Sequence, residues 1–172
     1  MSPADLLTEA IDRVLESVES VLDGADDALL AERPTPDANS IGWLVWHLTR
    51  VQDDHVADVA GTEQVWTDGG YAERFDLPIE TGDIGYGHTS AQVALVRAPA
   101  GLLADYYRAT HARTVEYLAS ISADDLDRVV DERWDPPVTL GVRLVSVVND
   151  CTQHVGQAAY LRGMLSPAPG RG

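Results

Sequence analysis

Residues 40–61 read SIGWLVWHLTRVQDDHVADVAG, and this stretch decides the fold class. Asn39 and Ser40 are both residue types that often cap the start of a helix, and Gly61 is typical of a helix C-terminus. Between them, apolar residues recur every three or four positions, which is the spacing of one helix face. They include Trp43, Leu44, Leu48 and Val51. The stretch therefore predicts a long amphipathic helix.

Three other segments have the same periodicity. Residues 3–22, 100–120 and 139–165 each place apolar side chains on one face, with polar residues between them. The sequence contains no convincing pair of strands. Four long helices of this kind predict an all-α four-helix bundle, and we expect residues 1–172 to form a single domain.

The connections between these helices are unequal. Residues 62–99 contain many glycines and little helical period, and only residues 92–96 resemble a short helix. The other two connections are short, with one extra helical turn expected at residues 26–31 and a capped turn at 122–126. A long central connection favours a crossover between the second and third helices. Long irregular connections in compact domains are usually functional or mobile.

Charge and hydropathy exclude several classes of partner. The chain has 172 residues, 45% of them hydrophobic, and a formal net charge of -16. This charge argues against binding to nucleic acid or to an anionic membrane surface. No run of about 20 apolar residues is present, so we expect no transmembrane segment. The first residues carry acids where a signal peptide carries bases, and we therefore expect a cytoplasmic protein.

Two residue counts narrow the possible chemistry. Cys151 is the single cysteine, which excludes an internal disulfide framework and a cysteine-rich zinc site. All twelve basic residues are arginine. Without lysine, Schiff-base chemistry and a phosphate-binding P-loop are both impossible.

Two histidines and one aspartate form a candidate metal site. Asp150 and His154 are four residues apart, so they lie on one face of the last predicted helix, in nearly the direction of Val147 and Leu161. His47 lies near the apolar face of the second helix. Three ligands from two helices leave coordination positions open for water or substrate. Nitrogen and oxygen ligands suit Zn, Ni, Mn or Fe(II) without choosing among them.

The same residues allow a purely structural interpretation. His47 is then a hydrogen-bonded core residue, and Asp150 with His154 is an ordinary helical pair. Spacing alone does not decide between the two interpretations.

Four other residues are candidates for the pocket around this site. Asp54 lies about 10 Å along the helix axis from His47, so it is expected beside the metal rather than on it. The side chain of its neighbour His55 is expected to point further away from the site. For both residues the alternative is that they are simply exposed at the surface. Gln157 is expected to hold a metal-bound water. The alternative is that this stretch only allows close packing of the helix. Arg162 would bind an anionic substrate, or interact with the helix dipole.

Cys151 is expected to be a small buried hydrophobic residue rather than a nucleophile. The remaining histidines, His88 and His111, have no partner that the sequence identifies.

Two segments resemble a known family. SIGWLVWHLTRVQDDHV (40–56) and NDCTQHVGQAAYLRGML (149–165) are similar to the DinB-like superfamily of metal-binding four-helix bundles. The closer likeness is to the actinobacterial branch that includes the metal-binding domain of mycothiol-dependent maleylpyruvate isomerase. The resemblance implies that His47, Asp150 and His154 are the metal ligands. Family members often have histidine or glutamate at the position of Asp150, and aspartate is shorter than glutamate.

The resemblance also implies a reaction. We expect a metal-dependent transferase or isomerase that joins a low-molecular-weight thiol, such as mycothiol or bacillithiol, to a small electrophile. Zinc is the first expectation for the metal. The alternatives are a stress protein that binds metal or a small ligand without turnover, a metal-dependent hydrolase, and a metal-free bundle that forms a homodimer.

Overall fold

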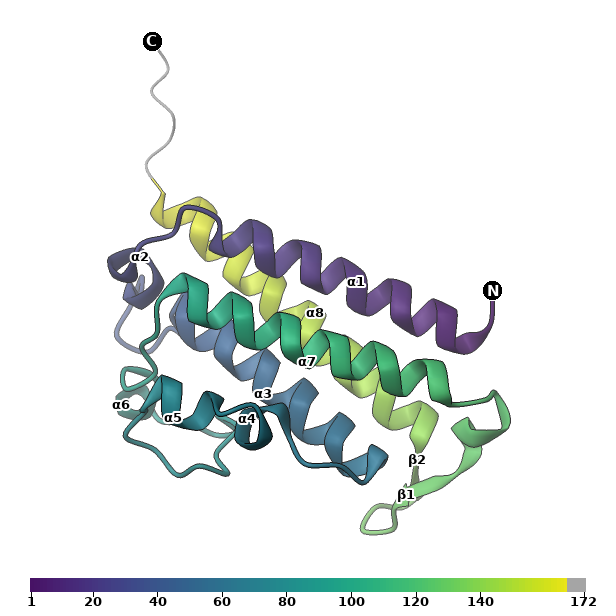
Figure 1. Ribbon diagram of the computed structural model, residues 1–172. Helices are drawn as coiled ribbons and strands as arrows, with labels where there is room; N and C mark the ends of the chain where they lie inside the picture. The colour runs from purple at the N-terminus through teal and green to yellow at the C-terminus, as the bar shows by residue number, and fades with distance from the viewer. Residues whose placement is uncertain (167–172) are drawn as a thin grey trace.

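The computed structural model describes residues 1–166 and confirms the predicted four-helix bundle (Figure 1). Its long helices are α1 (Pro3–Leu22), α3 (Ile41–Ala60), α7 (Ala100–Ser120) and α8 (Leu140–Leu165). No helix in residues 1–166 is both long enough and apolar enough to cross a membrane.

The four long helices form a square in which α1 and α3 each pack against both α7 and α8. In Figure 1, α3 and α7 run in one direction along the bundle, whereas α1 and α8 run in the other. Because α3 and α7 are consecutive and parallel, the chain between them must return along the length of the bundle. The crossover predicted for this connection is therefore confirmed.

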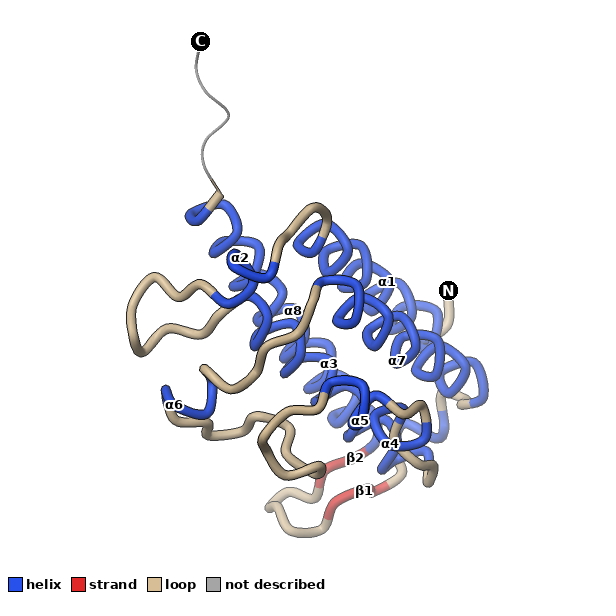
Figure 2. Tube along the Cα trace, turned by 60° about the vertical axis from the view of Figure 1, so that its left-hand side comes forward, coloured by secondary structure: helices blue, strands red, loops and turns tan. Residues whose placement is uncertain are grey.

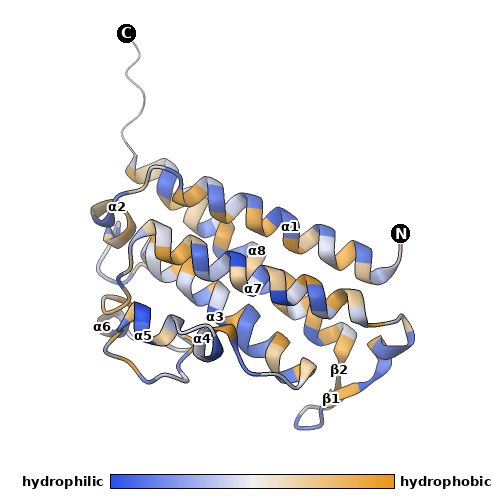
Figure 3. Cartoon of the chain, viewed as in Figure 1, coloured by the Kyte–Doolittle hydropathy of each residue, from blue (hydrophilic) through white to orange (hydrophobic). Residues whose placement is uncertain are grey.

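Local sequence explains where the long helices begin and end. The Ser40 hydroxyl accepts a hydrogen bond from the Trp43 backbone at the start of α3, and Gly61 ends this helix with a positive φ of 67°. The Thr139 side chain caps α8 in the same way. Figure 3 shows that apolar and polar residues alternate around each long helix. The apolar stripes form the core of the bundle.

The crossover contains more regular structure than the sequence predicted. Figure 2 shows its three short helices, α4 (Val65–Asp68), α5 (Tyr71–Phe75) and α6 (Ser90–Val93). The first two were not expected, and the third begins before the predicted 92–96 segment. Helices of four or five residues are too short for a periodic pattern, and contacts with the bundle stabilise them. The expected turns near 26–31 and 122–126 are α2 (Asp27–Ala31) and the 3-10 helix η1 (Asp124–Asp127).

A small antiparallel strand pair precedes α8, although the sequence predicted no strands. It joins β1 (Val129–Asp131) to β2 (Val138–Thr139). The buried Asp131 carboxylate accepts hydrogen bonds from the guanidinium groups of Arg133 and Arg143. These tertiary contacts stabilise strands that are too short to produce an alternating pattern.

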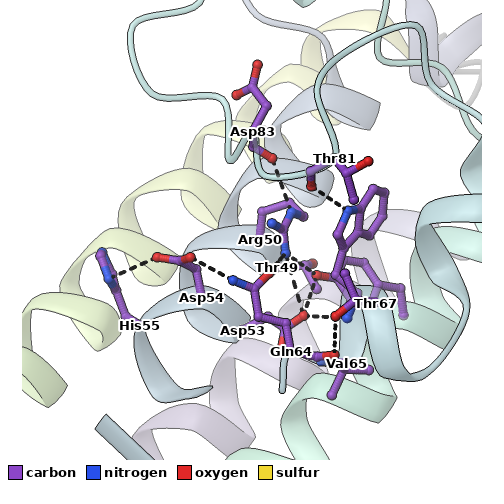
Figure 4. Close-up of polar contacts among 12 residues, drawn as sticks. Thr49, Arg50, Asp53, Asp54, His55, Gln64, Val65, Thr67, Thr81 and Asp83 are labelled. Carbon is purple, nitrogen blue, oxygen red and sulfur yellow. Dashed lines mark hydrogen bonds and ion pairs between the residues drawn. The ribbon is translucent and has the colours of Figure 1, made fainter. Parts of the chain in front are cut away.

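The crossover covers the outer side of α3, which explains why this helix is buried on nearly every side. Its polar residues find partners in the crossover, as Figure 4 shows. The Asp53 carboxylate accepts hydrogen bonds from the backbone N–H groups of Val65 and Trp66, each at 2.8 Å. The Arg50 guanidinium donates to the Gln64 side chain at 2.8 Å. The crossover is thus fastened along the helix that carries His47.

Candidate metal centre

His47, Asp150 and His154 come together between the antiparallel helices α3 and α8. One ligand atom from each residue lies within 4.8 Å of the other two. His47 is buried, and Asp150 and His154 are partly exposed. The structure therefore brings together all three residues that the sequence selected as ligands.

The His47 ring is oriented by the crossover. Its Nδ1 lies 2.5 Å from the Ile84 carbonyl oxygen. A carbonyl can only accept, so Nδ1 carries the proton and Nε2 of the neutral ring keeps its lone pair. The Trp43 ring stacks on the imidazole with centroids 4.6 Å apart. These contacts present His47 as a nitrogen ligand of fixed tautomer.

His154 has a similar arrangement on α8. Its Nδ1 lies 3.1 Å from the side-chain oxygen of Gln157, so Nδ1 again donates. Its Nε2 lies 3.5 Å from an Asp150 oxygen, and its ring meets that of His47 edge-on with centroids 4.7 Å apart. Gln157 therefore orients the His154 ring directly, whereas the sequence suggested that it would hold a metal-bound water.

Asp150 supplies the clearest indication that a cation fits this position. Its Oδ2 atom is buried and has no hydrogen-bond partner in residues 1–166. A buried carboxylate oxygen without a donor is costly, and such atoms normally have a partner or a bound ion. Two imidazole nitrogens and a carboxylate oxygen are a donor set that zinc and related divalent metals accept.

The pKa values of the two histidines differ in direction. Burial lowers the pKa of His47, which favours the neutral form that can bind metal. The hydrogen bond with Asp150 raises the pKa of His154, although burial opposes it. A proton on His154 therefore competes with a metal ion for Nε2.

Asp54 and His55 lie further along α3 and interact with each other. Asp54 accepts a hydrogen bond from Gln64 and lies 3.5 Å from Nδ1 of His55 (Figure 4). Arg143 of α8 also approaches that nitrogen, at 3.1 Å. Burial and the charge of Arg143 lower the pKa of His55. Neither residue belongs to the three-atom cluster.

Arg162 lies at a different place. Its guanidinium donates to the backbone carbonyls of Val21 and Asp23, at the end of α1. It therefore joins α1 to α8, and the structure does not bring it to the cluster.

Cys151 is fully buried, with its sulfur 3.6 Å from the Leu48 carbonyl and from the Gln52 side chain. Burial raises the pKa of this thiol far above its usual range. It is therefore a core residue, as the sequence indicated, and does not supply a nucleophile.

Sequence reasoning missed the residues that surround His47. His88 contacts Asp83 and Trp43, and the backbone of residues 84 and 85 lies against the His47 ring. The only signal was a histidine and an aspartate within a glycine-rich loop. Spacing within a loop does not reveal which helix the loop will cover. His111 pairs with Asp12 of α1, at 2.7 Å.

The crossover four-helix bundle, with a His–Asp–His cluster between its second and last long helices, is the class of fold and site that the resemblance to DinB-like bundles implied. Residues 6–167 match the family model of the mycothiol S-transferases. The chain therefore belongs to the mycothiol S-transferase family, and the resemblance noted in its two helical segments is confirmed.

The solved structures that are similar to this chain include the following two. A conserved protein from Enterococcus faecalis superposes with a TM-score of 0.89 at 36% identity, covering 96% of this chain and 98% of its own. A DinB-like protein from Bacillus cereus ATCC 10987 superposes with a TM-score of 0.61 at 20% identity, covering 95% and 94%. The second likeness supports the fold alone. No curated protein matches the chain.

Proposed function

We propose that this protein binds a divalent metal through His47, Asp150 and His154 and transfers a mycothiol-type thiol to a small electrophile. The observation that carries the proposal is the convergence of three ligand atoms within 4.8 Å. One of them belongs to the Asp150 carboxylate, whose Oδ2 is buried and has no hydrogen-bond partner in residues 1–166. Membership of the mycothiol S-transferase family supports the choice of thiol.

The residues of the chain suit this chemistry. A divalent cation bound to these ligands would lower the pKa of a coordinated thiol, and the thiolate is the reactive nucleophile. Three protein ligands leave room in the coordination sphere for that thiol. The thiol must come from a small molecule, because Cys151 is the chain's single cysteine and is buried. The thiol of the small molecule would give its proton to water, its sulfur would bond to the electrophilic carbon, and the leaving group would depart with its electron pair.

Zinc is the metal we propose first, with Ni, Mn and Fe(II) as alternatives that the same nitrogen and oxygen ligands accept. Family members often have histidine or glutamate at the position of Asp150. Aspartate is shorter than glutamate, yet one Asp150 oxygen lies within the 4.8 Å group.

Metal analysis of protein purified without a histidine tag tests the metal site. We expect near-stoichiometric metal in the native chain and its loss in a His47→Ala, His154→Ala double variant. An absence of metal in both proteins, even after incubation with Zn, Ni and Mn, would overturn the proposal.

A thiol-transfer assay then tests the reaction. Native protein is incubated with mycothiol and an electrophile such as monochlorobimane, and adduct formation is followed by fluorescence. We expect turnover that a chelator abolishes and added metal restores. Metal binding without turnover across several electrophiles would instead support a binding protein, and ester hydrolysis without thiol would support a hydrolase.

A further inference from the structure

The crossover segment 83–88 lies directly against the metal-facing part of α3. At Gly85, φ is 88°, and an added Cβ would lie 2.8 Å from Nδ1 of His47 and 3.0 Å from the Trp46 ring. A Cβ contact of that length essentially never occurs, so only glycine allows the backbone to approach the imidazole this closely. Glycine at position 85 therefore allows the backbone of this segment to contact the His47 ring.

Asp83 organises this segment through one of its two carboxylate oxygens. Oδ1 accepts a hydrogen bond from the Gly85 backbone at 2.7 Å. This contact fixes the turn in which the Ile84 carbonyl accepts the proton of His47 Nδ1. The Asp83 carbonyl also accepts from the Arg50 guanidinium at 3.3 Å, which ties the turn to α3 (Figure 4).

The second carboxylate oxygen of Asp83 is linked to His47 indirectly, through the side chains of His88 and Trp43. Oδ2 lies 2.8 Å from Nε2 of His88, whose side chain is 3% exposed. Nδ1 of His88 lies 3.1 Å from the Trp43 indole nitrogen. An indole N–H only donates, so Nδ1 must accept and Nε2 must carry the proton that goes to Asp83.

This link through His88 ends at the face of the His47 ring. The Trp43 ring that His88 holds is stacked on His47, at 4.6 Å and an interplanar angle of 13°. The same ring meets His154 edge-on at 6.3 Å. Asp83 thus controls both the edge of His47, through the turn, and its face, through His88 and Trp43.

We propose that Asp83 and His88 are positioning residues for the metal centre, which hold His47 with Nε2 directed toward Asp150 and His154. This inference rests on the proposed metal binding. Hydrogen-bond partners of a metal-binding histidine fix its tautomer and ring orientation, and their removal typically lowers metal affinity about 10- to 100-fold.

The rival explanation is that Asp83 only anchors a loop. In that case its loss lowers the stability of the fold but leaves metal affinity unchanged. Affinity and stability must therefore be measured separately on each variant.

The test compares four variants by competitive Zn²⁺ titration with a chromophoric chelator and by thermal unfolding of the metal-free protein. Asp83→Asn keeps the acceptor for Gly85 but places an amide opposite the N–H of His88. His88→Leu removes the link to Trp43, whereas His88→Gln keeps one donor and one acceptor. Asp12→Asn is the matched control, because it removes an Asp–His pair of 2.7 Å that joins α1 and α7.

We expect Asp83→Asn and His88→Leu to lower Zn²⁺ affinity about 10-fold or more, and His88→Gln to recover most of that loss. Asp12→Asn should leave affinity unchanged. Native-like affinity in Asp83→Asn and His88→Leu, with tight binding by the unmodified chain, would overturn the inference while the proposed function stands.

A metal-free measurement keeps the inference testable if the unmodified chain binds no metal. Long-range ¹H–¹⁵N correlation spectra report which ring nitrogen of His47 is protonated. We expect a single Nδ1–H tautomer in the unmodified chain and a mixture in Asp83→Ala, which removes the acceptor that holds Gly85 and the Ile84 carbonyl in the turn. One unchanged tautomer in both proteins would show that the segment does not position His47.

Discussion

Asp150 has two oxygens in unequal surroundings. One lies 3.5 Å from Nε2 of His154, and the other is buried without a hydrogen-bond partner in residues 1–166. In the metal-free protein the charge of this carboxylate therefore acts mainly on His154. A bound cation would balance that charge instead, and Nε2 of His154 would then carry no proton while Nδ1 keeps the proton that it donates to Gln157.

The contact between Asp150 and His154 leads to a prediction about pH dependence. Because the hydrogen bond with Asp150 raises the pKa of His154, the substitution Asp150→Asn should lower it. A folded-state pKa that is raised stabilises the fold at pH values below the ordinary histidine pKa, and this contribution disappears as pH rises through the raised value. Asp150→Asn should lack this contribution at acid pH.

NMR titration of the histidine ring protons in the metal-free protein measures the shift directly. His111, which pairs with the distant Asp12, is an internal control, and its ring-proton signals should be the same in both proteins under matched conditions. An unchanged His154 pKa in the variant would contradict the assigned contact.

At the scale of helices and loops, cap residues and periodicity were enough to place the four bundle helices. Ser40, Gly61 and Thr139 mark ends that the structure confirms. The pairing of Asp150 with His154 followed from helix geometry alone. Spacing by itself left the convergence of His47 on that pair open, because it depends on how α3 packs against α8.

The crossover was predictable as a connection but not as a structure. Its short helices are held by tertiary contacts such as those of Asp53, which no local pattern encodes. The link from Asp83 to His88 and Trp43 has the same origin, since it joins a loop to a helix far away in sequence. The candidate ligands could therefore be predicted from the sequence, whereas the residues that orient them could not.

Asp53 is expected to hold the crossover on α3. Its carboxylate accepts hydrogen bonds from two backbone N–H groups of the Val65–Trp66 segment and from the Tyr106 hydroxyl, and it lies 3.6 Å from Arg50. Asp53→Ala leaves these groups and a buried guanidinium without their anion. We expect the free energy of unfolding to fall by roughly 3–5 kcal/mol.

Chemical denaturation measures this loss, and hydrogen exchange at Val65 and Trp66 locates it. Asp58→Ala is the matched control, because Asp58 lies on the same helix and is exposed. Its effect should stay within about 0.5 kcal/mol. Equal effects of the two substitutions would show that Asp53 does not fasten the crossover.

At the scale of the whole molecule, a metal bound between α3 and α8 would join the two halves of the bundle. Ligand that binds only the folded state stabilises it by about 2.7 kcal/mol at a concentration 100 times its Kd. For a chain of this size each kcal/mol raises Tm by roughly 2–4 °C. We therefore expect added Zn²⁺ to raise Tm and a chelator to lower it.

Differential scanning calorimetry with and without Zn²⁺ provides the measurement. The His47→Ala, His154→Ala double variant should show no Zn²⁺-dependent change in Tm. A shift of equal size in that variant would mean that the metal acts at another place on this acidic chain, whose net charge is -16.

The position of the cluster between α3 and α8 also has a consequence for biosynthesis. A ribosome makes the chain from its N-terminus, so His47 and the crossover that surrounds it emerge long before Asp150 and His154. A nascent chain that ends after α7 holds one member of the cluster and leaves the faces of α1 and α3 that pack on α8 uncovered. Capture of the proposed metal would therefore have to wait until the last helix has been translated and has docked.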